Sequence, residues 1–338
     1  MMSVMGKHVS IGIAAAVMVI ANTAHRVDAA PAAEIVVAIR YLQAEGTSHA
    51  HLYLYREDGK LLRQLTKVEK GQDREPVFAP DGEMIVFTRD LGKDVKEWWS
   101  IEPRGGGLKQ LKVAPEWYAS GKSSPYFTNR TPENWPEGER IPGSPGMEGD
   151  EPSRFRAPDG SVELVLGEVK GGEENGVDGM GHGADYLLRD LKTGKDTRMG
   201  DLPGFEGLWD ILHGTIDAKE FFLFQGSLRL AFFGLHLDSS AGDTSYALDL
   251  NKRRLVRLSP AWAAPIPLPG ESAFLTLSYE RYLPIPGSSK NENCSFMERW
   301  DTDFNKVRYA KPDTAPICYG ASMYRPGKTP VVVTIREE

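Results

Sequence analysis

Acidic and histidine side chains gather in a glycine-rich stretch near the middle of the chain, residues 167–183 (GEVKGGEENGVDGMGHG). Carboxylate oxygens on a flexible hairpin are ligands that suit Ca²⁺. The spacing matches neither the EF-hand loop nor the nonapeptide calcium repeat, and such hairpins are also found simply as solvated loops. A weak metal site and a solvated hairpin therefore both stay open, and the candidate ligands are Glu173, Glu174, Asp178 and His182.

The remaining reactive residue types give no catalytic signature. Beyond residue 29 no two histidines have the spacing of helical metal ligands, although His49 and His51 lie on one face of a predicted strand and distant ligands can converge in a fold. The chain has no G-x-S-x-G nucleophile turn. Acidic pairs suited to glycoside chemistry are abundant, and spacing singles out none of them. We therefore assign no catalytic residue and expect no cofactor, with Ca²⁺ as the alternative.

Aromatic residues mark the segment 113–150, which contains six prolines and five glycines. Long irregular segments in compact domains are often functional, and exposed aromatic rings are good anchors for proteins or sugars. Alternatively, these rings cover the edge of a sheet or form the core of a degenerate repeat unit. The candidate partner-binding residues are Trp117, Tyr118, Tyr126, Phe127 and Trp135.

The two cysteines, Cys294 and Cys318, both lie in the last fifth of the chain. In an oxidising compartment they would form one disulfide, if the geometry allows, and stabilise the fold by about 2–4 kcal/mol. Two separate buried thiols are the alternative, and the sequence leaves both open.

The first 29 residues have the pattern of a secretory signal. Lys7 and His8 precede an apolar run at 9–21, and small residues lead to a cleavage position after Ala29. The run is too short to span a bilayer comfortably. We therefore expect export and a soluble periplasmic or secreted product that begins at residue 30, with an uncleaved anchor as the alternative.

Composition and charge exclude several classes of protein. Of 338 residues, 41% are hydrophobic and 26% are charged, which is typical of a soluble domain with a buried core. The 40 basic and 47 acidic residues give a net charge of −7, which argues against a nucleic-acid binder and against stable attachment to anionic membranes. We expect a monomer.

An internal repeat positions these segments. Residues 52–66 (LYLYREDGKLLRQLT) align without a gap on residues 98–112 (WWSIEPRGGGLKQLK), which predicts the same β-hairpin twice. A preceding hairpin with a Pro-Asp-Gly turn, at 75–87, recurs at 151–166. Together these hairpins form a unit of four strands with a period near 45 residues, which predicts a β-propeller blade.

The two chain ends carry complementary half-units. The strand at 35–41 and its hairpin lack a preceding Pro-Asp-Gly element, whereas the last hairpin, 322–336, is a first hairpin with no second hairpin after it. We therefore predict that both ends pair in one blade and close the ring, which hides edge strands. Copies of the second hairpin end near residues 66, 112, 199, 259 and 309. The interval from 112 to 199 favours six blades, with a degenerate blade or a long insertion at 113–150, and five or seven are the alternatives.

The motif E-P-x-F-A-P-D-G at 75–82, with the hairpin ending R-Q-L-T at 63–66, resembles the TolB-like (WD-like) propeller repeat family. The usual Ser before Pro-Asp-Gly is Ala79 or Ala157 here, and no segment matches a separate N-terminal domain, so TolB itself is not indicated. The resemblance implies one exported all-β propeller domain, 30–338, that works by binding. We expect a non-catalytic scaffold for a protein or glycan of the cell envelope. A propeller hydrolase or lyase acting on a carbohydrate or lactone, with an axial acidic and histidine site, is the alternative.

Overall fold

The protein is all-β in the computed structural model, as predicted. Within the described ranges it has twenty-two strands and one short helix, α1 (Glu116–Ser120). No helix in this part of the chain has the length and apolar content needed to cross a membrane. The predicted signal, 1–29, lies outside these ranges. The described residues are 32–120, 139–140, 154–156, 160–168, 184–198, 201–203, 222–225, 229–235, 244–259, 265–268 and 271–333.

The strands form five antiparallel sheets. One sheet combines both ends of the chain, and we call it the closing sheet. Its order is β22 (Val331–Val333), β21 (Pro316–Tyr324), β1 (Glu34–Tyr41), β2 (Ala50–Arg56) and β3 (Leu61–Gln64). The β4–β7 sheet contains β4 (Gln72–Phe78), β5 (Ile85–Asp90), β6 (Lys96–Ile101) and β7 (Lys109–Leu111).

The other three sheets also keep chain order between neighbouring strands. The β8–β12 sheet contains β8 (Glu139–Arg140), β9 (Arg154–Arg156), β10 (Val162–Glu168), β11 (Ala184–Asp190) and β12 (Asp196–Arg198). The β13–β16 sheet contains β13 (Phe222–Gln225), β14 (Arg229–Leu235), β15 (Thr244–Asp249) and β16 (Arg254–Ser259). The β17–β20 sheet contains β17 (Ile266–Pro267), β18 (Ala273–Pro284), β19 (Asn291–Asp301) and β20 (Lys306–Tyr309).

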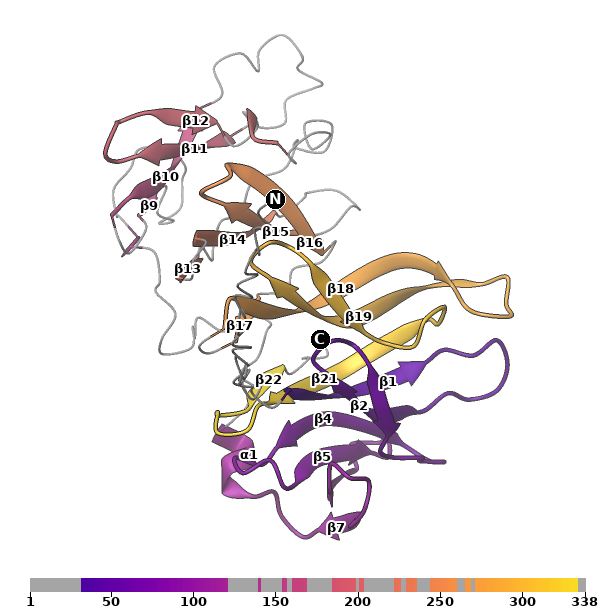
Figure 1. Cartoon of the computed structure of the whole chain (residues 1–338). Helices are drawn as coiled ribbons and strands as arrows, with labels where there is room; N and C mark the ends of the chain where they lie inside the picture. The colour runs from indigo at the N-terminus through magenta and orange to yellow at the C-terminus, as the bar shows by residue number, and fades with distance from the viewer. Residues whose placement is uncertain are drawn as a thin grey trace, which may run out of the picture. The chain divides into compact units, whose positions relative to one another are not determined.

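The pairing of the chain ends is confirmed. Strand β1 pairs with β2 on one side and with β21 on the other, in a register that places Glu34 opposite Tyr324 and Arg40 opposite Ile317. In Figure 1 the yellow C-terminal strands therefore lie beside the indigo N-terminal ones. The described residues form five sheets, and the six predicted blades are not confirmed.

All five copies of the second hairpin form where the repeat predicts them, as β2–β3, β6–β7, β11–β12, β15–β16 and β19–β20. Three of them share one turn device: an aspartate ends the first strand, at Asp190, Asp249 and Asp301. Each Oδ1 accepts backbone N–H groups two to four residues further on, at 2.8–3.1 Å. Such Asx turns are strictly local, so a sequence repeat is enough to place them.

The core lies on both faces of β1. Because successive side chains of a strand point to opposite faces, Ile35, Val37 and Ile39 pack with the β17–β20 sheet, whereas Val36 and Ala38 pack with the β4–β7 sheet. All five side chains are buried. A strand that is apolar on both faces is typical of an element between two packed sheets, and the closing sheet occupies that position here.

The Pro-Asp-Gly turn after β4 contacts strand β21 near the end of the chain. The hydroxyl of Tyr324 donates to the Asp81 carbonyl at 2.9 Å, and the Phe78 N–H donates to Ser322 Oγ at 3.2 Å. Gly82 has a φ of +75°, and a Cβ there would lie 2.1 Å from the Tyr324 ring. Glycine is therefore required at this turn for conformation and for close approach of the ring.

Candidate functional site

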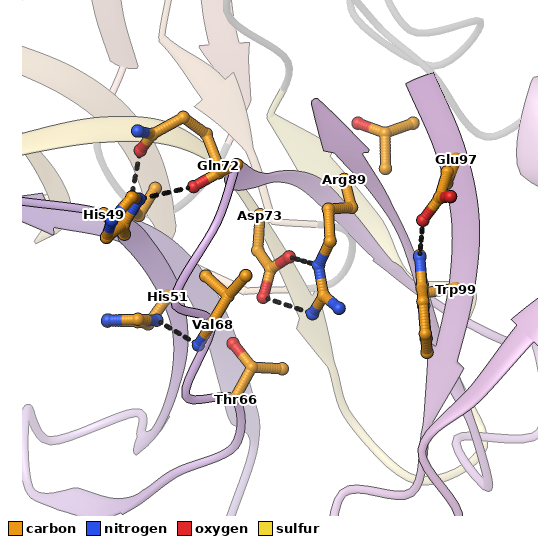
Figure 2. A network of polar contacts seen from close by, with 12 residues as sticks. His49, His51, Thr66, Val68, Gln72, Asp73, Arg89, Glu97 and Trp99 are labelled. Carbon is orange, nitrogen blue, oxygen red and sulfur yellow. Dashed lines mark hydrogen bonds and ion pairs between the residues drawn. The ribbon is translucent and has the colours of Figure 1, made fainter. Parts of the chain in front are cut away.

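Polar side chains gather where the closing sheet meets the β4–β7 sheet (Figure 2). They come from the start of β2, from the linker after β3, and from β4, β5 and β6. Figure 2 shows dashed contacts among them and to the linker backbone. We call this set the polar cluster; its members are His49, His51, Thr66, Gln72, Asp73, Arg89, Glu97 and Trp99.

Asp73 and Arg89 form the charged centre of the polar cluster. They lie directly opposite each other in the β4–β5 register, so their side chains share one face of the sheet. Arg89 Nε and Nη2 donate to the two carboxylate oxygens at 2.7 and 3.1 Å, and the Asp73 side chain is wholly buried. The guanidinium also stacks on the Trp99 ring, 4.5 Å from its centroid. Trp99 Nε1 in turn donates to Glu97 at 2.9 Å.

The two histidines both bond to the linker through Nδ1, but this nitrogen donates in His49 and accepts in His51. His49 Nδ1 lies 2.9 Å from the Gly71 carbonyl oxygen, which only accepts, so Nδ1 carries the proton. His51 Nδ1 accepts the Val68 N–H at 3.2 Å, so this nitrogen is unprotonated. The linker that leads from the closing sheet into β4 is thus bonded to His51 in β2 and to His49 immediately before β2.

Two neutral side chains complete the attachment of the linker. Gln72 Oε1 accepts the Ala50 N–H at 2.6 Å, and Thr66 Oγ1 accepts the Leu52 N–H at 3.0 Å. The polar cluster therefore uses its donors and acceptors to join two sheets. Gln72 and Thr66 bond backbone N–H groups of β2, while His49 and His51 bond backbone groups of the linker.

Burial lowers the pKa of His51, and the positive charges of His49, Lys311 and Arg89 act in the same direction. The Asp73 carboxylate opposes them and raises it. The net shift is downward, so His51 is neutral at pH 7, as its accepting Nδ1 requires.

We expect a pH-dependent stability from His51. Its unfolded pKa is about 6.5 and its folded pKa is lower, so below about pH 6.5 the unfolded state binds more protons. The contribution of His51 to the unfolding free energy is therefore fully present above about pH 6.5, and it is lost as the pH falls towards the folded pKa. Urea unfolding at about pH 7.5 and 5.5 measures this loss. In His51→Asn, whose amide oxygen replaces the accepting nitrogen, the loss should be smaller than in the wild type.

His49→Asn is the matched control, because His49 donates through Nδ1 and keeps that bond when protonated. This variant should lose stability on acidification as the wild type does. Equal pH dependence in the wild type and in His51→Asn would contradict the assignment to His51.

A tyrosine group adjoins the histidines. The ammonium of Lys311 lies 5.1 Å from the Tyr41 ring centroid and 5.0 Å from that of Tyr53, and the Lys311 N–H donates to the Tyr41 hydroxyl at 2.9 Å. The Tyr41 and Tyr55 hydroxyls are 3.1 Å apart. Burial raises the pKa of Tyr53 and of Tyr55 strongly, so both stay protonated and neither is a base or nucleophile near pH 7.

The predicted aromatic residues fall in two groups. Tyr118 is buried; its ring packs edge-on against Trp98 at 4.9 Å and its hydroxyl donates to the Glu75 carbonyl at 2.9 Å. Trp117 packs at the margin of the same apolar cluster, so both α1 rings pack on the β4–β7 sheet. The other three candidates lie outside the described residues: Tyr126, Phe127 and Trp135.

The predicted metal ligands Glu173, Glu174, Asp178 and His182 also lie outside the described residues. Across the ranges that are described, no three His, Cys, Asp or Glu side chains gather closely enough to hold a metal ion. The cysteines are two separate buried thiols, Cys318 in the core beside β1 and Cys294 in a second cluster. Burial raises the pKa of Cys294 to about 11 and that of Cys318 to about 12, which keeps both thiols unreactive near neutral pH.

Sequence reasoning singled out His49 and His51 and missed Gln72, Asp73 and Arg89. The available signal was the charged pair in the two strands that flank the Pro-Asp-Gly turn. Using it requires the strand register, which shifts between Arg74 and Val77 at a bulge. A bulge changes which residues face each other, so counting back from the turn does not pair Asp73 with Arg89.

No family model and no curated protein matches the chain. Several solved structures resemble it at low similarity. TolB from Acinetobacter baumannii is 11% identical at a TM-score of 0.22, over 89% of this chain, which spans 65% of that protein. An oligogalacturonate lyase in complex with manganese is 10% identical with a TM-score of 0.23, and the match covers 90% of this chain and 91% of the lyase. The tricorn protease is 13% identical with a TM-score of 0.18, and the match covers 88% of this chain and 25% of the protease. At these scores no function follows from the likeness.

Proposed function

We propose that the chain is an exported, non-catalytic propeller module that binds a protein or glycan of the cell envelope as a monomer. The observation that carries this proposal is the polar cluster. Its acid, base and amide groups are engaged with one another and with the backbone that joins two sheets. A catalytic site needs groups that can take up or release protons on a substrate, whereas a scaffold needs rigid junctions between its sheets.

The test separates binding from turnover. Envelope material is divided into a protein fraction and a glycan fraction, and each is titrated into the purified protein while fluorescence anisotropy reports binding. We expect saturable binding of a component of one fraction, which mass spectrometry shows to be unaltered afterwards. Turnover of a saccharide or lactone that is abolished in His51→Ala, with the fold intact by circular dichroism, would overturn the proposal in favour of an enzyme. Absence of saturable binding to either fraction would also overturn it.

A further inference from the structure

Strand β7 is the outer strand of the β4–β7 sheet. Strand β7 pairs with β6 on one side and, in the part of the chain that the structure describes, with no strand on the other. Large apolar side chains stand exposed at both ends of this strand, Leu108 at 49% and Val113 at 74%. An edge strand presents unpaired backbone donors and acceptors, and exposed apolar residues beside it favour pairing with another segment.

Three lysines surround this edge. Lys96, Lys109 and Lys112 are exposed, and the described side chains include no carboxylate in an ion pair with any of them. Outer strand β20 differs, because its Lys306 and Arg308 both pair with the buried Glu298 of the adjacent strand. Among the described side chains, the positive charge along β7 has no such carboxylate partner.

A groove of about 470 Å³ follows the same edge. Its described lining comes from β6 and β7 and the residue after β7: Lys96, Glu97, Trp98, Gln110, Leu111 and Lys112. The Trp98 ring is held edge-on by Tyr118 at 4.9 Å, and Glu97 accepts the Trp99 indole N–H. The groove thus combines a fixed aromatic wall with cationic ends, and its one carboxylate already has a partner.

From this geometry we infer that β7 accepts an extended, acidic segment of a partner protein as an additional strand. Side chains of a strand alternate in direction, so Lys109 lies on the face of Trp98 and Leu111, whereas Lys112 lies on the opposite face. The backbone edge supplies the pairing, acidic side chains on either face of the added strand meet one of these lysines, and Leu108, Trp98 and Val113 contact its apolar side chains. The inference rests on the proposed binding function and specifies the partner as a protein with an acidic, alternating segment. Lysines also protect edge strands from pairing, and that role is an outcome of the test below.

The probe is a fluorescent octapeptide of alternating glutamate and valine, titrated into the full mature chain at low ionic strength with anisotropy as the readout. We expect saturable binding that weakens as salt is raised. A peptide of alternating lysine and valine should not bind. Two versions of the acidic peptide, N-methylated on alternate amides in either phase, distinguish strand pairing from charge attraction, and at least one should lose binding about tenfold or more.

The variant Lys109→Glu/Lys112→Glu should weaken binding of the acidic peptide at least about tenfold and gain binding of the lysine peptide. Two other exposed lysines supply the matched control, Lys60→Glu/Lys195→Glu, which changes net charge equally and should bind as the wild type does. Circular dichroism confirms that both variants are folded.

Four results would overturn the inference. Equal binding by both N-methylated peptides would show charge attraction without strand pairing. Failure of the acidic peptide to bind would show that the lysines only protect the edge. Dimerisation of the wild type that Lys109→Glu/Lys112→Glu abolishes, seen by sedimentation, would assign the edge to a second copy of the chain. If this variant still binds the envelope component, the inference fails while the proposed function stands.

Discussion

Deleting residues 316–338 is expected to leave a chain that does not fold cooperatively. The deletion removes β21 and β22, so β1 loses a strand partner and its pairing from Glu34 to Tyr41. Ala321, Met323 and Val333 leave the core as well. Burial of each large apolar side chain contributes about 1.5–3 kcal/mol, and a whole domain is stable by about 5–15 kcal/mol. The loss of Met323, Val332 and Val333 together with the β1–β21 pairing is therefore comparable with the whole stability of the fold.

The measurement is thermal unfolding followed by near-ultraviolet circular dichroism. The shortened chain should show no cooperative transition, and adding a synthetic peptide of residues 312–333 in trans should restore one. Deleting 334–338, which follow β22 in the sequence, is the control for a shortened chain that keeps β21 and β22, and it should preserve the cooperative transition. A chain that lacks 316–338 yet melts like the full one would refute closure through β1 and β21.

Replacing Asp73 by Ala should cost about 3–5 kcal/mol of unfolding free energy, because it leaves a largely buried guanidinium without its carboxylate. The Asp73 side chain is 0% exposed and that of Arg89 12%, so water cannot solvate the remaining charge fully. Urea unfolding measures the loss. The same substitution removes the Coulombic contribution that raises the pKa of His51, so the folded pKa should fall further.

A double-mutant cycle isolates the ion pair. Arg89→Met keeps an apolar stem against Trp99, and the combined Asp73→Ala/Arg89→Met variant should cost less than the sum of the two single changes, because no charge is left unpaired. The exposed pair of Arg56 and Asp58 is the control. Asp58→Ala should leave the unfolding free energy nearly unchanged, since water screens both groups. Strictly additive losses at Asp73 and Arg89 would mean that the pair is not coupled.

The strands and turns of this protein could be predicted from the sequence because they depend on neighbouring residues. A continuous run of apolar residues marked β1, alternating aliphatic and aromatic residues marked β2, and the Pro-Asp-Gly and Asx turns fixed where hairpins reverse. The half-units at the two ends also predicted a shared sheet, because the strands that one half-unit lacks are present in the other. The TolB-like resemblance depended on the same turn motif and implied the same propeller architecture.

Only the tertiary structure decided what the side chains between those turns do. Asp73 faces Arg89 because a bulge in β4 sets their register, and His49 and His51 differ in tautomer because one meets a carbonyl and the other an N–H group of the linker. Tyr118 was a candidate anchor by its loop composition and is a core residue by its packing on Trp98. Turn chemistry acts over a few residues, whereas burial, charge pairing and proton position depend on segments brought together by sheets packing face to face.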